Sequence, residues 1–330
     1  MIKYIVKRLV LMIPILLCIV LIVTILMDIT PGDPARIVAG STATEEEYQK
    51  VREDLKLDDP LLLRYARFIG GAVKGDFGTS FITKTSVFDD IMTRFPYTAV
   101  LAILSVLLAV IIGIPLGILA ATNQNTWKDY LAIFFSLLCS SMPAFWLALL
   151  LVQWFAVKTS IFPVSGIEQW TGWVLPVVSL ALGYAASIAR LTRSSTLEVI
   201  RQDYITTARA KGVHERTVLY RHVLKNSLIP VITSVGAIFG MALGGALIAE
   251  TIFSIPGLGT YTITALTNRD YPAIQGSVLF LSLLFSIVIL VVDILYAIID
   301  PRIRSQYSSG RKQRKHKKVL AGSAAAAKEE

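Results

Sequence analysis

Residues 97–121 have the sequence YTAVLAILSVLLAVIIGIPLGILAA, in which no side chain is charged. A helix needs about 20 apolar residues to cross the ~30 Å hydrocarbon core of a bilayer, so this stretch is long enough to span a membrane. It is apolar throughout, whereas the strands of a membrane barrel alternate apolar and polar residues over ~10 positions. The stretch therefore predicts a transmembrane helix that begins near Pro96 or Tyr97 and ends near Ala121.

Five more uncharged stretches share this property, namely residues 9–27, 130–157, 170–189, 226–249 and 271–292. The composition agrees, because 54% of the residues are apolar and only 17% are charged, against about 25% charged in soluble domains. We expect an all-α polytopic membrane protein with six transmembrane helices. The first helix lies in residues 1–28, and the core 96–299 holds spans at about 97–121, 131–156, 172–190, 227–249 and 276–298.

The distribution of positive charge predicts the orientation of these spans. If the N-terminus is cytoplasmic, the inside segments include eight basic residues from Arg190 to Lys225 and nine from Arg302 onward, whereas the two short outside loops hold only Lys158 and Arg269. Cytoplasmic loops carry the excess of Lys and Arg, so both termini are expected in the cytoplasm. The net charge of +9 is thus a topology signal, and nucleic-acid binding is not expected. The basic tail, residues 300–330, is expected to be disordered.

Residues 29–95 form the one sizeable segment outside the membrane on the far side. Thr44 precedes three consecutive glutamates, which is a typical helix start. The Asp-Asp-Pro sequence at 58–60 ends that helix, and residues 61–73 have an amphipathic pattern. We expect an extracytoplasmic helical insertion, which is either a cap without chemistry of its own or a docking surface or lid beside a translocation pathway.

The cytoplasmic loop 200–225 is the most informative part of the chain for function. It contains two helical patterns separated at Gly212, and Val218, Leu219, Val223 and Leu224 form an apolar stripe in the second. A helix–glycine–helix elbow that is half apolar and half basic suits insertion into a groove of a partner protein. The residues alone leave open an amphipathic loop that lies on the lipid surface.

This loop resembles the coupling loop of permease subunits of ATP-binding-cassette (ABC) importers. That pattern has Glu-Ala-Ala, three residues, Gly, nine residues and Ile-x-Leu-Pro; here Ala208, Gly212 and Leu224 match, while the leading Glu, the Ile and the Pro do not. The Thr-Ala-Arg-Ala-Lys-Gly form at 207–212 resembles the peptide-permease branch. Four more segments resemble that branch: Pro-Gly-Asp-Pro at 31–34, Ser-Met-Pro-Ala-Phe-Trp at 141–146, Glu-Thr-Ile-Phe-Ser-Ile-Pro-Gly-Leu-Gly at 250–259 and Asp-Pro-Arg at 300–302.

The resemblance to an oligopeptide/dipeptide (peptide/nickel) permease B-type subunit implies the type I importer fold, a place in the bacterial cytoplasmic (inner) membrane and a set of partners. These are a second homologous permease subunit in a heterodimer, two ABC ATPase subunits and an extracytoplasmic substrate-binding protein, besides membrane lipid. ATP and Mg²⁺ would be bound by the ATPases, and this chain would bind no cofactor and would not be an enzyme, since it contains no Gly-x-x-x-x-Gly-Lys-Ser/Thr loop. The residues expected to couple to the ATPases are Tyr204, Thr207, Ala208, Arg209, Lys211, Gly212, Val213, Glu215 and Arg216.

Ionisable residues within membrane spans are functional candidates by default. Asp293 is expected either to pair with Arg302 or a residue of a partner subunit, or to line the pathway as a carboxylate for a substrate amino group. Glu250 has the same two interpretations. Pro143, Phe145 and Trp146 are further candidates for a pathway or structural role. No metal site is expected from the three histidines, His214, His222 and His316, or from Cys18 and Cys139.

Two other classes of function are possible from the residues. A membrane-embedded enzyme would need a nucleophile–base pair or paired carboxylates at lipid depth, and no histidine lies in a span. A stand-alone ion-coupled carrier or channel would predict internal repeats and charged positions at the midplane of the membrane. Within the importer class, dipeptides, oligopeptides, nickel or another solute all remain open as substrates.

Overall fold

The structure is a computed structural model that describes residues 2–40 and 42–299, so the tail expected to be disordered, residues 300–330, lies outside the described residues. The helices are α1 (Ile2–Ile29), α2 (Pro34–Ala39), α3 (Glu45–Asp54), α4 (Leu61–Ala72), α5 (Val87–Thr122), α6 (Trp127–Ser141), α7 (Ala144–Leu151), η1 (Val152–Lys158), η2 (Trp170–Trp173), α8 (Val174–Ile200), α9 (Asp203–Ala210), α10 (Glu215–Thr217), η3 (Val218–Leu224), α11 (Lys225–Ile252), α12 (Leu258–Thr267) and α13 (Tyr271–Ile299). The described part of the chain contains one isolated antiparallel bridge, between Thr79 and Ser86, and no β-strand.

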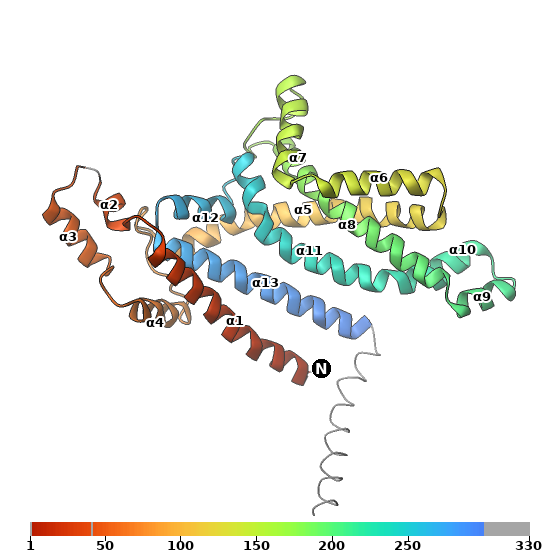
Figure 1. Cartoon of the computed structure of the whole chain (residues 1–330), viewed down its shortest axis with the longest axis horizontal. Coiled ribbons are helices and arrows are strands. Elements are labelled where there is room, and N and C mark those ends of the chain that lie inside the picture. Colours follow the sequence, from red (N-terminus) through yellow and green to blue (C-terminus); the bar gives the residue numbers. More distant parts are fainter. Residues whose placement is uncertain (1, 41, 300–330) are drawn as a thin grey trace, which may run out of the picture.

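Five long helices form an elongated bundle (Figure 1). By length and composition α1, α5, α8, α13 and the continuous run through α10, η3 and α11 can each cross a membrane, and the bent pair of α6 with α7–η1 makes a sixth crossing if it counts as one span. Helix α8 packs against α5, α6 and α11, while α13 packs against α11 and α1. Helices α2 to α4 lie at one end of the bundle, here the cap end, and α9 and α10 lie at the other, the elbow end.

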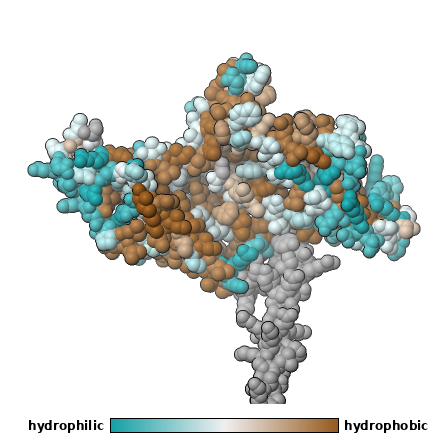
Figure 2. Space-filling model, in the orientation of Figure 1, coloured by the Kyte–Doolittle hydropathy of each residue, from teal (hydrophilic) through white to brown (hydrophobic). Residues whose placement is uncertain are grey.

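The surface of the bundle has the pattern expected of a membrane protein (Figure 2). Apolar residues cover the middle of the visible face, and hydrophilic residues gather at the cap end and at the elbow end. Large apolar side chains on the long helices are exposed, including Leu107 and Ile111 of α5 and Ile22 of α1. An exposed apolar surface of this extent is stable in lipid and would aggregate in water.

The second span begins earlier than predicted. Helix α5 starts at Val87 rather than near Pro96, because Ser86 caps its first turn by accepting a hydrogen bond from the Asp89 backbone N–H at 3.4 Å. Asp89 and Asp90 lie in that turn, where their negative charge stabilises the positive end of the helix dipole. The apolar pattern identified the part of α5 that can span the membrane, and the cap set where the helix begins.

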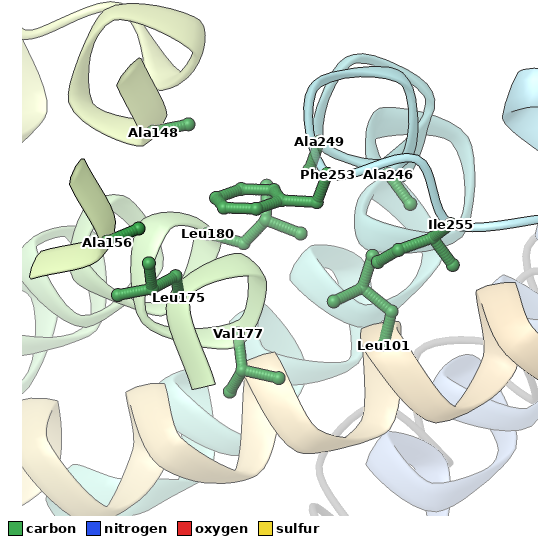
Figure 3. Packing of buried hydrophobic residues seen from close by; sticks show 10 residues of the cluster. All are labelled: Leu101, Ala148, Ala156, Leu175, Val177, Leu180, Ala246, Ala249, Phe253 and Ile255. Carbon is green, nitrogen blue, oxygen red and sulfur yellow. The ribbon is translucent and has the colours of Figure 1, made fainter. Parts of the chain in front are cut away.

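The third span, predicted over 131–156, is interrupted by a sharp bend. Helices α6 and α7–η1 meet at 101°, and the break lies at Met142 and Pro143. Proline disfavours the helical conformation of the residue before it, and Met142 is indeed extended (φ −83°, ψ 129°). Beyond the bend, Ala148 and Ala156 pack against a buried cluster on α8 and α11. Figure 3 shows Phe253 in the middle of that cluster, between these two alanines and Ala246.

Glycines allow a close approach between α5 and α8. A Cβ on Gly113 would lie 2.8 Å from the Ala185 carbonyl oxygen, and one on Gly117 would lie 2.5 Å from that of Ala189. Real Cβ atoms do not approach other heavy atoms this closely. The small residues therefore set the distance between these two helices, as they do in many membrane bundles.

The segment between α1 and α5 contains the two helices predicted from its sequence, α3 and α4. Thr44 and Glu47 form a complete capping box at the start of α3, with the Thr44 N–H donating to Glu47 at 2.8 Å. The Tyr48 hydroxyl and Arg52 of α3 donate to the Asp33 carboxylate at 2.6 and 2.7 Å. The Pro-Gly-Asp-Pro sequence at 31–34 thus connects α1 to this cap through the side chain of Asp33.

Candidate functional site

The predicted elbow is formed by α9, the turn at Gly212, and the run of α10 and η3 that leads into α11. Gly212 has a φ of +77°, the left-handed region that favours glycine, and its N–H donates to the Arg209 carbonyl at 2.9 Å. The Val213 N–H donates to the Ala208 carbonyl at 3.3 Å. These two bonds satisfy carbonyls at the end of α9, so the glycine closes one helix and turns the chain into the next.

The elbow has a small hydrophobic core of its own. Ile205, Val218 and Val223 are fully or almost fully buried there, and Ala208 and Val213 pack against them from either side of the glycine. Ala208 thus packs on the core of the elbow, and a Cβ on Gly212 would meet nothing of this chain within 4 Å. Within the chain, the positive φ of Gly212 accounts for the glycine. The role of both residues in docking an ATPase stays a prediction.

The polar residues of the elbow are exposed, and two of them pair with each other. Arg209 and Glu215 form a two-point ion pair across the Gly212 turn, with Nε to Oε2 at 3.1 Å. The hydrogen bonds from its guanidinium to Glu215, together with the charge of that carboxylate, raise the pKa of Arg209 above its ordinary value, against a lowering by burial. The expected coupling residues Tyr204, Thr207, Lys211 and Arg216 are exposed on the outside of the elbow.

Tyr204 and Thr207 also support the elbow. The Tyr204 hydroxyl accepts a hydrogen bond from Asn226 Nδ2 at 3.1 Å, which links α9 to the start of α11. The Thr207 hydroxyl donates to the Asp203 carbonyl at 2.9 Å within α9. The arrangement is a compact hairpin of helices that is attached to α11 and carries an exposed basic surface.

Glu250, one of the two candidate carboxylates, is fully buried near the cap end of α11. It accepts three hydrogen bonds, from the Thr98 hydroxyl at 2.6 Å and from the Gly259 and Thr260 N–H groups at 2.7 and 3.1 Å. The same Thr98 oxygen accepts from the Leu258 N–H at 2.8 Å. Glu250 and Thr98 together therefore cap the first turn of α12 and connect it to α11 and α5. We refer to these groups as the α12 clamp.

Glycines bring the chain close to this carboxylate. A Cβ on Gly257 would overlap the carboxyl group of Glu250, and one on Gly259 would overlap the backbone of Leu247. The Pro-Gly-Leu-Gly sequence at 256–259 thus provides the close approach that lets the backbone N–H groups reach Glu250. The sequence pattern located this motif, but it contained no indication of Thr98.

Asp293, the other candidate carboxylate, pairs with a residue that the sequence did not suggest. Arg8 Nη1 of α1 lies 3.0 Å from Asp293 Oδ2 of α13. The predicted pairing with Arg302 falls on a residue outside the described part of the chain. Glu250 contacts α5 and α12, whereas Asp293 pairs with Arg8 of α1, so these contacts do not bring the two candidate carboxylates together.

The candidates Pro143, Phe145 and Trp146 lie at the bend between α6 and α7. Pro143 precedes the first residue of α7, and Phe145 and Trp146 expose about half of their surface in this chain. The structure accounts for Pro143 through the bend itself. It places the two aromatic side chains on an apolar arm that projects from the bundle (Figure 1).

Sequence reasoning missed a buried ion pair between α6 and α8. The Asp129 carboxylate is almost completely buried and accepts two hydrogen bonds from Arg193, at 2.6 and 2.7 Å, and one from the Asn125 N–H at 3.0 Å. Next to it, Arg190 donates to the Ser136 carbonyl and the Ser140 hydroxyl. The available signal was an acidic residue at the start of one predicted span and basic residues at the end of the next.

Comparisons with known proteins match nearly the whole chain. The family model described as "Binding-protein-dependent transport system inner membrane component" matches residues 113–305, and the model of the N-terminal part of such membrane components matches residues 1–102. The glutathione transport system permease protein GsiC of Escherichia coli K12 is 42% identical over 304 residues, which cover 92% of this chain and 99% of the relative. The GsiC protein of Salmonella paratyphi A gives the same identity and coverage.

Solved structures share the fold at lower sequence identity. The inward-facing MetNI methionine ABC transporter aligns with a TM-score of 0.55 at 18% identity in one crystal form, over 64% of this chain and 96% of the solved chain. An amino acid ABC transporter crystallised with histidines aligns with a TM-score of 0.50 at 16% identity, over 65% of this chain and 94% of the solved chain. The helical bundle is therefore the fold of ABC importer permeases.

Proposed function

Because this chain belongs to the inner membrane component family of binding-protein-dependent transport systems, we propose that it forms half of the pathway through which an ABC importer takes up di- or oligopeptides. Family membership makes the chain a membrane-spanning permease subunit of such an importer, and it implies partner ATPase subunits and a substrate-binding protein. A stand-alone carrier or channel is not favoured, because the matched family is defined by its dependence on a binding protein.

The substrate class rests on one observation, the identity of 42% with a glutathione permease over almost the full length of both proteins. Glutathione is a tripeptide, so a peptide-like solute is the substrate that this relative favours. The pathway of this chain would be completed by a second, different permease subunit. Both termini and the elbow would lie in the cytoplasm, in agreement with the excess of Lys and Arg in the loop 200–225.

Coupling to ATP hydrolysis would pass through the elbow. Its own hydrophobic core holds α9 against η3, the Arg209–Glu215 ion pair joins α9 to α10, and the Tyr204–Asn226 hydrogen bond joins this unit to α11. A unit that is rigid and attached to a spanning helix transmits the movement of a docked ATPase to the bundle. Converting a 1:99 population of two states to 99:1 takes about 5.5 kcal/mol of differential binding, which ATP binding to the partner subunits would supply.

The experiment that tests this function is reconstitution of the complete importer. The chain is expressed with its second permease, ATPases and binding protein, purified in mild detergent and placed in lipid nanodiscs. ATP hydrolysis is then measured with di-, tri- and oligopeptides, with glutathione, with a nickel chelate and with free amino acids. We expect hydrolysis to rise only when the binding protein and a peptide are both present.

Two outcomes would contradict the proposal at different levels. Stimulation by the nickel chelate or by amino acids, and not by any peptide, would retain the importer and reject the peptide substrate. A chain that purifies alone under several detergents, with no nucleotide-hydrolysing partner, would remove the basis for coupling through the elbow.

A further inference from the structure

A groove of about 430 Å³ runs along the bundle between α1, α11 and α13. Its walls are apolar side chains of α1 and α13, including Met12, Ile15 and Phe285, and Gly240 and Gly244 of α11 form its floor. The floor at Gly244 is open, since a Cβ there would meet nothing within 4 Å. The groove is thus preformed and largely apolar, and the space above Gly244 can hold part of a ligand.

The length of the groove is set by the residues that line it. On α1 the lining extends from Arg8 to Ile19, and on α13 from Leu281 to Asp293. At 1.5 Å per residue these segments are about 17 and 18 Å long. One leaflet contributes about half of the ~30 Å hydrocarbon core, so the groove is about one leaflet deep. A transmembrane helix of a partner would need a groove along the full thickness, which this one does not offer.

One end of the groove is charged and the other is apolar. At the charged end, Arg8 Nη1 lies 3.0 Å from Asp293 Oδ2, and the two side chains keep 42% and 22% of their surface exposed. No hydrogen bond of good geometry reaches Asp293 Oδ2 from the described part of the chain. Asp293 lines the groove and keeps 22% of its side chain exposed, so a donor in the groove can reach its carboxylate beside the ion pair.

The two charges specify the headgroup. The polar end presents one cation and one anion side by side, so it matches a headgroup that carries a phosphate and a primary ammonium group together. The phosphate would accept from the Arg8 guanidinium, and the ammonium would donate to the Asp293 carboxylate. An anionic headgroup without an amine would place its phosphate near the negative charge of Asp293 with no ammonium to offset it.

We propose that this groove is a binding site for one phospholipid with a zwitterionic, amine-bearing headgroup, held by Arg8 and Asp293, with an acyl chain along α1 and α13. The assignment to the cytoplasmic leaflet rests on the orientation proposed above, with the N-terminus of α1 in the cytoplasm. The bound lipid fills the space between α1 and the core helices, and it adds to the ion pair and hydrogen bonds that already join α1 to α13.

Native mass spectrometry of the purified importer tests this site. The protein is exchanged into detergent with phosphatidylethanolamine, phosphatidylglycerol or phosphatidylcholine, and the number of lipids retained per complex is counted at increasing collision energy. We expect one phosphatidylethanolamine to survive at energies that remove the other two lipids. Loss of one charge-assisted hydrogen bond in Arg8→Gln or Asp293→Asn should weaken its retention at least about tenfold.

A second variant fills the groove without touching the charges. Gly244→Leu places a side chain in the open floor, and we expect it to abolish the retained lipid while the complex still assembles. Gly70→Leu is the matched control, because a Cβ on Gly70 of the cap also meets nothing within 4 Å. Equal lipid retention in the unmodified importer and in Gly244→Leu would overturn the proposal.

A photo-reactive amino acid at Ile15 identifies the occupant in the intact membrane. A lipid-sized adduct supports the site, and a subunit-sized product would assign the groove to the second permease and overturn the proposal.

Neither the native mass spectrometry nor the photo-crosslinking depends on transport. An importer that takes up peptides but retains no lipid would contradict the lipid site alone, and one that retains the lipid but is not stimulated by peptides would contradict only the proposed substrate.

Discussion

Replacement of Glu250 is the most informative test of how the α12 clamp works. In Glu250→Ala, the Thr98 hydroxyl and the N–H groups of Gly259 and Thr260 lose their acceptor. In Glu250→Gln, the amide oxygen can still accept from the two N–H groups, but the amide nitrogen cannot accept from Thr98. The two variants therefore remove three hydrogen bonds and one, respectively, at the same buried position.

The structure gives the expected size of each effect. A buried donor without a partner costs about 1–3 kcal/mol, so three donors give a loss of about 3–9 kcal/mol in Glu250→Ala and one gives about 1–3 kcal/mol in Glu250→Gln. The unfolding entropy is about 2.1 cal/mol/K per residue, so for the 330 residues of this chain a change of 1 kcal/mol shifts the Tm by roughly 1.4 °C. We expect a fall in Tm of at least about 4 °C for the alanine variant and of roughly 1.5–4 °C for glutamine.

The assay measures stability and transport separately. The Tm is obtained by heating the purified importer and following the folded fraction by size-exclusion chromatography, with Glu168→Ala as the control at an exposed glutamate. The control should stay within about 0.5 kcal/mol of the unmodified protein. Because Glu250 is fully engaged by α12 and α5, the KM for peptides should be unchanged in Glu250→Gln.

Two results would refute this reasoning. The first is a Tm for Glu250→Ala equal to that of the unmodified importer. The second is a KM that rises for peptides with a free amino terminus and not for blocked ones, which would make Glu250 a residue of the pathway. The double variant with Thr98→Val adds a check, since residues in one network should lose less together than the sum of the single losses.

Three more predictions concern the elbow, the cap and the buried ion pair. Gly212→Asp should leave membrane insertion intact but uncouple ATP hydrolysis from peptide uptake. Gly75 on the cap has a similar φ of +82°, so the control Gly75→Asp should transport normally. Equal uptake by both variants would contradict the elbow assignment. Burial raises the pKa of Asp33, but its hydrogen bonds and nearby arginines outweigh this and hold the pKa below 3.8. The contacts of the Asp33 carboxylate with Tyr48 and Arg52 are therefore present above that pH and are lost as the pH falls through the folded-state pKa. Hydrogen exchange in α3, corrected for intrinsic rates, should therefore be constant from about pH 5 to 8 and faster below about pH 4, and Asp33→Asn should remove this dependence. Asp129→Ala should destabilise the importer by about 3–5 kcal/mol because it leaves Arg193 without its carboxylate partner, and an unchanged Tm would contradict this expectation.

The sequence alone determined the class of the protein and the place of its candidate elbow. Hydrophobicity and periodicity are properties of neighbouring residues, so the spans, the two helices of the cap and the elbow at Gly212 could be predicted without any contact. The capping box at Thr44 and the left-handed glycine at 212 are equally local, and both are present in the structure. The break in the third span also had a local signal in Pro143, although its angle did not.

Only the tertiary structure decided the partners of the charged residues. Glu250 and Thr98 are 152 positions apart, and Asp129 and Arg193 are 64 apart, so the bundle has to form before either pair can meet. The same holds for Arg8 and Asp293, which come from the first and last long helices. A buried charge needs a partner within a few ångströms, and a sequence shows that such a partner is required but does not identify it. That identity depends on which helices pack together, a property of the whole bundle.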